Sequence, residues 1–226
     1  MKFAALVLFA GVMMLPAQTP GDAGTVSPFG IGFYGGMGVH GMLGGGLVDY
    51  INASSAFGDE TSPAGVSVDF FGGAEAEVTG AWGLRAEYAY HFKSYSFRAP
   101  SGALHDLFAS LKMPTLFVQR YWKGRGYRFT LGAGIGYHAG TVEQTVSTFG
   151  VTTVHSAEGP AIAVEAAGQT AFDGHLYGYI SLRAGHEFIG TVTDGSGAEL
   201  KNALRGTKAT LGITYGGVRF GLMYHI

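Results

Sequence analysis

The stretch that decides the fold is LRAEYAYHFK, residues 84–93. Its even positions are apolar or aromatic up to Phe92. Its odd positions are Arg85, Glu87, Ala89, His91 and Lys93. Period-two alternation is typical of a β-strand, because successive side chains point to opposite faces. One face of this predicted strand is therefore apolar, and the other carries all of its charges.

The same alternation recurs along the chain. Further alternating stretches begin at Phe29, Val66, Tyr127, Ile162 and Ile180. In these stretches the ionisable side chains share one face, and the opposite face is apolar for ten or more residues in the longest. A tilted membrane-spanning strand needs about 9–11 residues, whereas strands of soluble domains average about five or six. We therefore predict membrane-spanning strands. A strand from about Met113 to Trp122 alternates less cleanly, and its facing stays open.

Composition agrees with this prediction and excludes several classes of function. Of 226 residues, 39 are glycine, 13% are aromatic and only 13% are charged. The net charge of −2 gives no electrostatic reason to expect a nucleic-acid partner. The chain has no cysteine, which excludes disulfides, thiolate metal sites, catalytic thiols and a lipoprotein anchor.

The N-terminus has the pattern of an export signal. Lys2 precedes an uncharged apolar run from Phe3 to Leu15, which is too short to cross a hydrocarbon core of about 30 Å as a helix. We predict a signal peptide over residues 1–17, cleaved after Ala17, and a barrel domain over residues 18–226; cleavage near Ala23 is the alternative.

The predicted connections alternate between short and long, as in outer-membrane barrels. The short ones are 80–82, 123–126 and 172–175, and the long ones are 42–65, 98–111, 141–156 and 191–205. Trp82 and Trp122 flank two short turns, where we expect interfacial anchors.

Two of the long connections have patterns of their own. Residues 141–155 are rich in Thr and Val and predict a protruding hairpin with its tip near Phe149-Gly150, which could bind a protein by strand addition or only stiffen a loop. Residues 104, 107, 108 and 111 are apolar with a 3/4 spacing, which predicts a short amphipathic helix.

The polar faces predict a charged interior. A hairpin centred on Ala81 places Glu77 opposite Arg85 and Asp69 opposite Lys93, and one centred on Gly174 places Glu165 opposite Arg183. The first hairpin also places two carboxylates, Glu75 and Glu87, opposite each other. Buried charges are tolerated only when they are paired, so we expect a filled lumen rather than a wide pore. The predicted lumenal charge network comprises Asp69, Glu75, Glu77, Arg85, Glu87, Lys93, Arg128, Glu165, Arg183 and Glu187.

The C-terminal segment carries a resemblance to a known superfamily. Phe220, Leu222, Tyr224 and Ile226 alternate with other residues to the end of the chain, which resembles the terminal strand by which outer-membrane proteins are recognised for barrel insertion. That strand usually ends in Phe. With the signal peptide and strand pattern, the chain resembles the small bacterial outer-membrane barrels of the opacity-protein and OmpA-transmembrane-domain type. The resemblance implies the bacterial outer membrane as location. It implies outer-membrane lipid, lipopolysaccharide and the barrel-assembly machinery as partners.

The strand count depends on Gly216-Gly217. The apolar phase changes there, so the pair forms either a β-bulge, which we favour, or a turn. A bulge leaves eight strands. A turn would add a strand and require another, such as 47–52, to restore an even number. We predict an all-β fold, a transmembrane antiparallel up-and-down β-barrel of eight strands.

No motif specifies chemistry. The G-x-G-x-x-G match at Gly30–Gly35 lies within a predicted strand and has no helix after it, unlike a dinucleotide-binding turn. The inward-facing His40, His91 and His138 have no carboxylate spacing that would define a metal site. Ser94 and Ser96 with His91 or His105 are the candidates for a rim enzyme, but nothing in their spacing specifies a triad. We predict no catalytic, cofactor-binding or metal site, and no enzyme.

The function predicted from the sequence is a structural or surface-interaction role. The extracellular loops would carry it through a surface ligand, and paired charges would close the lumen. The alternative is a narrow channel or lateral conduit for small or hydrophobic molecules, with the mouth opening toward Phe108. A lipid-modifying rim enzyme is a third hypothesis.

Overall fold

A computed structural model describes residues 30–43, 45–56, 61–62, 64–147 and 150–226. The predicted signal peptide over residues 1–17, both suggested cleavage sites and the predicted tip residue Phe149 lie outside the described residues.

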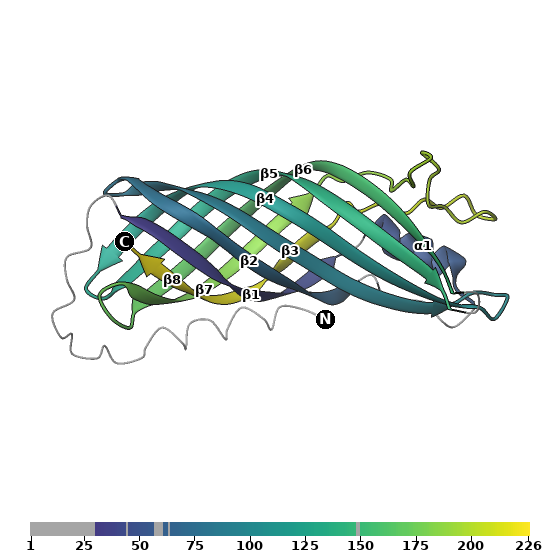
Figure 1. The fold of residues 1–226 in the computed structure, drawn as a ribbon, viewed down its shortest axis with the longest axis horizontal. Helices are drawn as coiled ribbons and strands as arrows, with labels where there is room; N and C mark the ends of the chain where they lie inside the picture. The colour runs from purple at the N-terminus through teal and green to yellow at the C-terminus, as the bar shows by residue number, and fades with distance from the viewer. Residues whose placement is uncertain (1–29, 44, 57–60, 63, 148–149) are drawn as a thin grey trace, which may run out of the picture.

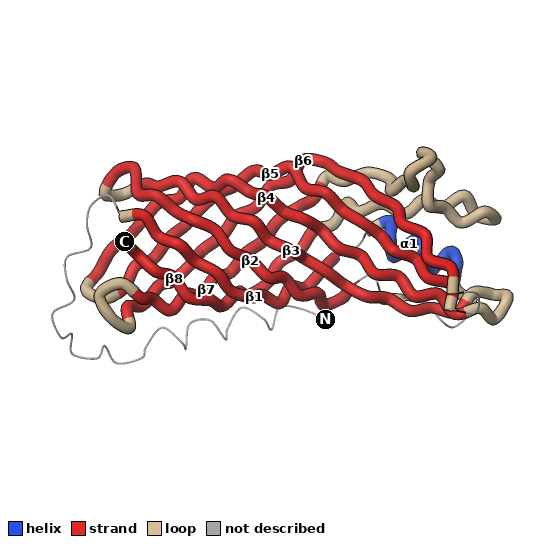
Figure 2. Tube along the Cα trace, viewed as in Figure 1, coloured by secondary structure: helices blue, strands red, loops and turns tan. Residues whose placement is uncertain are grey.

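Eight antiparallel strands form one closed barrel. In chain order each strand pairs with the next, and the last pairs with the first (Figures 1 and 2). The fold class and the number of strands predicted from the sequence are confirmed. One helix, α1 (Gly46–Ser54), follows the first strand. No helix among the described residues is long and apolar enough to cross a bilayer. The strands are β1 (Ile31–Leu43), β2 (Ala64–Thr79), β3 (Trp82–Arg98), β4 (Leu104–Gly124), β5 (Tyr127–Val146), β6 (Val151–Ala171), β7 (Leu176–Glu187) and β8 (Thr214–His225).

An apolar belt covers the outside of the barrel. Large hydrophobic side chains on all eight strands are exposed, as the alternation predicts. On β4 the exposed even-numbered residues include Lys112 and Arg120. The sequence did not decide which side of this strand faces outward, and the structure shows that it is the side of these even-numbered residues. These two cations bound the apolar segment of β4. The guanidinium of Arg120 lies 5.7 Å from the ring of Trp82 and 5.3 Å from that of Trp122, near the end with the short turns.

The strands differ in length, so one side of the barrel extends beyond the other. β4, β5 and β6 have 20 or 21 residues, whereas β1, β7 and β8 have 12 or 13. The hairpin predicted over residues 141–155 is confirmed. The helix predicted over residues 104–111 is wrong, as is the long loop over 98–111. β4 pairs with β3 from Leu104 onward, which leaves only residues 99–103 as a turn. The 3/4 spacing of four apolar residues is too short a pattern to exclude a strand. The backbone hydrogen bonds of this segment to both neighbouring strands, β3 and β5, hold it in the sheet.

The glycine pair at 216–217 is neither a turn nor a bulge. β8 pairs with β1 in an unbroken register through both glycines, so the bulge favoured from the sequence is wrong. Leu211, Ile213 and Tyr215 are buried. Like the inward-facing Arg219 they occupy odd-numbered positions, so they lie on the inward side of the same segment. The apolar residues switch from odd to even positions along this segment because the interior is apolar near the mouth and charged deeper in the barrel. Near the mouth the inward-facing residues are therefore apolar too. Residues 47–52, the alternative extra strand, lie in α1.

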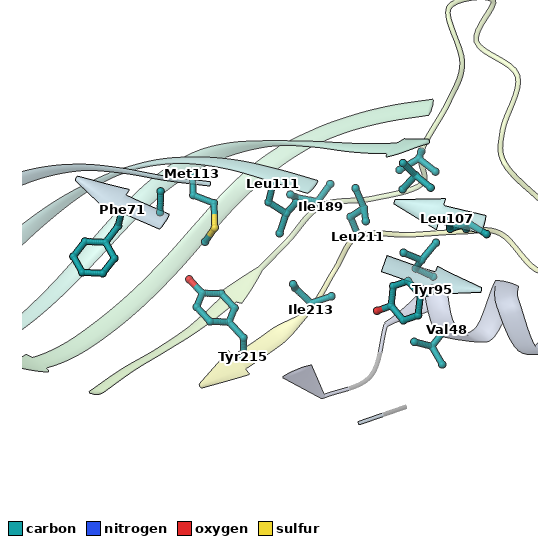
Figure 3. Close-up of a cluster of buried hydrophobic side chains, with 14 of the residues drawn as sticks. Val48, Phe71, Tyr95, Leu107, Leu111, Met113, Ile189, Leu211, Ile213 and Tyr215 are labelled. Atoms are coloured by element: carbon teal, nitrogen blue, oxygen red, sulfur yellow. The ribbon is translucent and has the colours of Figure 1, made fainter. Parts of the chain in front are cut away.

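The outer end of the barrel is filled by an apolar mouth cluster. Helix α1 and the segment 188–213 pack against the inner faces of the long hairpins, so that Ile51, Val142 and Val192 are fully buried. Figure 3 shows Leu111, Ile189, Leu211 and Ile213 gathered here. Backbone bridges such as Ser156–Thr193 tie the segment to β6. Each such side chain, once buried, contributes about 1.5–3 kcal/mol. We define the mouth cluster as Leu47, Val48, Ile51, Tyr95, Leu107, Leu111, Val142, Ile189, Val192, Leu200, Leu211 and Ile213.

Candidate functional site: the barrel interior

Three arginines and three carboxylates form the central ion-pair layer. Arg85 lies 2.6 Å from Glu165, and Arg219 lies 2.9 Å from Glu87 and 3.5 Å from Glu165. Two further ion pairs join Arg219 to Asp69 and Arg183 to Glu87. All six residues are at most 4% exposed. With equal numbers of each sign, the layer has no net charge, as burial requires.

Aromatic rings fill the spaces between these charges. The guanidinium of Arg85 lies 4.2 Å from the ring centre of Phe117, and that of Arg219 lies 4.4 Å from Phe71. The hydroxyl of Tyr34 donates to Glu87 at 3.1 Å, and the hydroxyl of Tyr179 donates to Glu165. The rings of Tyr34 and Tyr179 stack with centres 5.9 Å apart. The layer is therefore packed as well as paired.

Inward-facing glycines let these side chains meet across a strand. Gly38 of β1 lies between Asp69 on β2 and Arg219 on β8, and a Cβ there would collide with both side chains. Gly73 of β2 lies in the same way between Tyr34 and Glu87. The glycine-rich alternation of the sequence thus makes room for the ion pairs, as a missing side chain allows close approach.

A second polar group lies nearer the short turns. Arg128 pairs with Glu75 and donates to Gln169 at 2.9 Å. The side-chain nitrogen of Gln119 donates to Glu75 at 2.8 Å. Lys123 lies 2.5 Å from Glu77 and is the most exposed member of these pairs. The interior therefore carries compensated charge over two successive levels.

Histidines lie between the central ion-pair layer and the mouth cluster. His40 lies 3.1 Å from Asp69, and His138 lies 2.6 Å from Glu187. The Nε2 atom of His91 lies 2.5 Å from the hydroxyl of Ser67. Within the described ranges, no group of three or more His, Asp or Glu residues is arranged to hold a metal ion.

Nine of the ten predicted lumenal charges are buried in the barrel, and Lys93 departs from the prediction. It lies near the mouth, half-buried, with its ammonium 4.8 Å from the ring of Tyr95. The predicted pair of Asp69 and Lys93 is wrong, because Asp69 lies opposite His91 and pairs with His40 and Arg219.

The predicted register of the β2–β3 hairpin is also wrong. A bulge between Glu77 and Thr79 shifts the pairing, so that Glu75 and not Glu77 lies opposite Arg85. Glu87 then lies opposite Gly73, and the expected contact between Glu75 and Glu87 does not occur. On the other hairpin, Glu165 lies opposite Arg183 as predicted.

Arg219 is the central residue that the sequence analysis left out. It has the opposite parity to Phe220, Leu222 and Tyr224, which are all exposed on the belt. That parity was the available signal, since it places Arg219 in the lumen.

Ser96, one of the two serines proposed for a rim enzyme, is hydrogen-bonded to a carboxylate and not to a histidine. The hydroxyl of Ser96 donates to Asp106 at 2.6 Å, and His105 stacks on Phe97 and contacts Gln144 at 2.8 Å. Among the described residues no hydrogen bond joins Ser94 or Ser96 to a histidine. Ser67, which does contact His91, is 3% exposed.

The belt and the interior together settle the class of fold. An even number of antiparallel strands, short turns at one end, an apolar exterior and a charged interior distinguish one type of barrel. The chain is a transmembrane β-barrel of the bacterial outer-membrane type.

Comparisons with known proteins find this barrel shape at low sequence identity. No protein-family model and no curated protein matches the sequence. Ail, the attachment invasion locus protein of Yersinia pestis, is 13% identical, with a TM-score of 0.47 over 88% of this chain and 98% of its own. Neisserial surface protein A is 12% identical, with a TM-score of 0.47 over 89% and 99%. The outer-membrane protease OmpT of Escherichia coli is 8% identical, with a TM-score of 0.48 over 91% and 99%. These similarities are too distant to indicate what the barrel binds or catalyses.

Proposed function

We propose that the barrel is closed to solutes and that its role is structural or surface-interacting, carried by the extracellular part. The observation that supports this most directly is the double filling of the interior. The central ion-pair layer occupies the middle of the barrel, and the mouth cluster occupies its outer end. A barrel of eight strands has room for side chains and little else.

The extracellular part supports a surface role because it is built as an ordered structure. The β3–β4 and β5–β6 hairpins extend beyond the belt, and α1 packs against their inner side. The hydroxyl of Tyr50 on α1 donates to Gln144 on β5 at 3.2 Å. Near the hairpin tips, Leu104, Val151 and Val154 are exposed. A fixed surface with exposed apolar side chains suits recognition of a partner at the cell surface.

Single-channel conductance of the refolded mature chain in planar bilayers tests the closed lumen. We expect the wild type and the Arg85→Ala/Arg183→Ala variant to be silent, because the mouth cluster still seals the outer end. Adding Leu211→Ser and Ile213→Ser should open a path in a variant whose circular dichroism still shows a barrel. Steady conductance of the wild type would refute the closed lumen and favour the channel or conduit.

Cell binding tests the surface role. Bacteria that display the barrel are expected to bind a host-cell or extracellular-matrix surface more strongly than bacteria without it. The triple variant Leu104→Ser, Val151→Ser and Val154→Ser should lose this gain at equal surface abundance. A matched variant with three serines on the belt side of β7 controls for stability. If display adds no binding to any surface tested, the surface role is wrong and a purely structural role remains.

The channel, the lateral conduit and the rim enzyme remain competing hypotheses. A conduit opening toward Phe108 would have to displace this ring, whose centre lies 6.1 Å from that of Phe92. A rim enzyme would have to bring Ser94 or Ser96 to His91 or His105. Measured hydrolysis of a lipid ester by the purified chain, lost on His91→Ala, would replace the proposal with an enzymatic one.

A further inference from the structure

A single cation faces the lipid in the half of the barrel with the short turns. Arg120 lies exposed on the outward side of β4, and among the described residues no other charged side chain lies on the outward faces of the strands in this half. The residues from Lys112 to Arg120, at about 3.3 Å each and tilted by about 40°, rise about 20 Å across the bilayer. The apolar band of such barrels is about 25 Å tall. Arg120 therefore lies near the periplasmic edge of the hydrocarbon.

Both tryptophans of the chain lie beside Arg120. The guanidinium carbon is 5.7 Å from the ring centre of Trp82 and 5.3 Å from that of Trp122. Trp82 lies directly opposite Arg120 in the register of β3 and β4, and Trp122 is the next residue on the same face of β4. The two tryptophans are 48% and 43% exposed. The guanidinium and both indoles are therefore accessible to lipid together.

The barrel wall supplies no carboxylate to compensate this charge. None of the ion pairs within the described ranges includes Arg120. Its outward neighbours on β3 and β5 are Trp82 and Leu131, and the next residues on the same faces, Leu84 and Phe129, are also uncharged. A lipid-facing arginine is costly in the hydrocarbon, and the cost falls near the interface, where its head can reach polar groups. The compensating group must therefore come from the lipid or from water.

We propose that Arg120, with Trp82 and Trp122, binds the phosphate of one anionic phospholipid of the periplasmic leaflet. These three side chains offer hydrogen-bond donors and no acceptor, and a guanidinium fork matches two oxygens of a phosphate. A head group without an ammonium, as in phosphatidylglycerol, leaves the phosphate charge to Arg120, whereas the ammonium of a zwitterionic head group competes for it. The inference concerns the lipid-facing wall, so it does not depend on whether the lumen conducts or on what the extracellular part binds.

Tryptophan fluorescence tests the proposal, because the only two tryptophans of the chain lie at the site. The full barrel is reconstituted in phosphatidylcholine vesicles that contain the same mole fraction of either brominated phosphatidylglycerol or brominated phosphatidylcholine, whose bromines quench indoles on contact. We expect the phosphatidylglycerol to associate about fivefold more strongly, which is the upper range for an exposed ion pair. Inorganic phosphate in the buffer should not remove this preference, since it has no acyl chains to hold it at the wall.

Variants separate Arg120 from the general charge of this end of the barrel. Arg120→Gln removes the charge and should abolish the preference for phosphatidylglycerol, and Arg120→Lys keeps a cation without the fork and should retain part of it. The single-tryptophan variants Trp82→Phe and Trp122→Phe should each keep the preference, because the remaining indole still lies beside Arg120. The matched control is Arg125→Gln, which removes an exposed arginine from the short turn at the same end and should change nothing.

Four results would contradict the proposal. Equal quenching of the wild type by the two brominated lipids would overturn the anionic ligand and leave Arg120 packed on the indoles for structural reasons alone. A preference that survives in Arg120→Gln would overturn the role of Arg120. Equal losses in Arg120→Gln and Arg125→Gln would replace the site with a diffuse attraction to this end of the barrel. Loss of the preference in inorganic phosphate would replace the lipid with a free anion.

Discussion

Replacing Arg219 with methionine tests the central ion-pair layer most directly. Arg219 contacts Asp69, Glu87 and Glu165, and it is fully buried. Its removal leaves three carboxylates facing two arginines, so one negative charge is uncompensated inside the barrel. Breaking a buried pair by removing one partner costs about 3–5 kcal/mol. Methionine retains much of the volume, so we assign this cost to charge rather than to a cavity.

The assay is urea unfolding of the refolded barrel in lipid vesicles, followed by tryptophan fluorescence. The free energy of unfolding should fall by about 3–5 kcal/mol in Arg219→Met, but by no more than about 0.5 kcal/mol in Arg125→Met, which removes an exposed turn arginine. The double variant Arg219→Met/Asp69→Asn restores neutrality and should lose less than the sum of its single variants, by about 0.5–3 kcal/mol. Equal losses in Arg219→Met and Arg125→Met, or strict additivity, would refute a compensated charge layer.

Three further predictions concern a glycine, the helix and an extracellular carboxylate. Gly38→Ala should destabilise the barrel by about 1–3 kcal/mol, since its Cβ collides with the ion pair that crosses β1. Gly80→Ala, whose Cβ meets nothing within 4 Å, is the control in the same unfolding assay. Ile51→Ala on α1 should cost about 2–5 kcal/mol and expose the outer end to protease, whereas an unchanged protein would mean that α1 does not seal the mouth. Hydrogen bonds from Ser96 and Ser147 lower the pKa of Asp106 below 3.8, so its support of the two hairpin tips is present above this pH and lost as the pH falls through the lowered pKa. Titration by NMR of the carboxyl carbon checks this, and an unchanged midpoint in Ser147→Ala would contradict it.

The strand pattern was predictable because a membrane barrel keeps one physical rule along its whole length. Outward side chains meet lipid and inward side chains meet other polar groups, so period two persists and parity alone assigns a face. This reasoning found the lumenal position of Arg85, Glu87, Glu165 and Arg183, and the pairing of the last two.

The predictions that were wrong concern positions where another interaction outweighs the alternation of inward and outward side chains. The bulge at Glu77–Thr79 is a local backbone event that no side-chain pattern announces, and it moved the partner of Arg85 by two residues. The interior is charged along most of the barrel but apolar at the mouth cluster. The buried apolar residues Leu211 and Ile213 therefore suggested, from the sequence, that the strand had changed the face it turns outward. Their burial depends on helix α1, which is distant in sequence.

Arg219 has a further consequence, because it lies on the strand that closes the barrel. Among the six residues of the central ion-pair layer, those on β2, β3, β6 and β7 carry three negative and two positive charges. The third positive charge, Arg219, lies on β8, and it reaches Asp69 of β2 across Gly38 only when β8 pairs with β1. In an open sheet of all eight strands these two charges lie near opposite edges, and water must solvate both of them. Closure of the ring and pairing of Arg219 with Asp69 are thus one event, which makes partly closed intermediates unfavourable in the hydrocarbon.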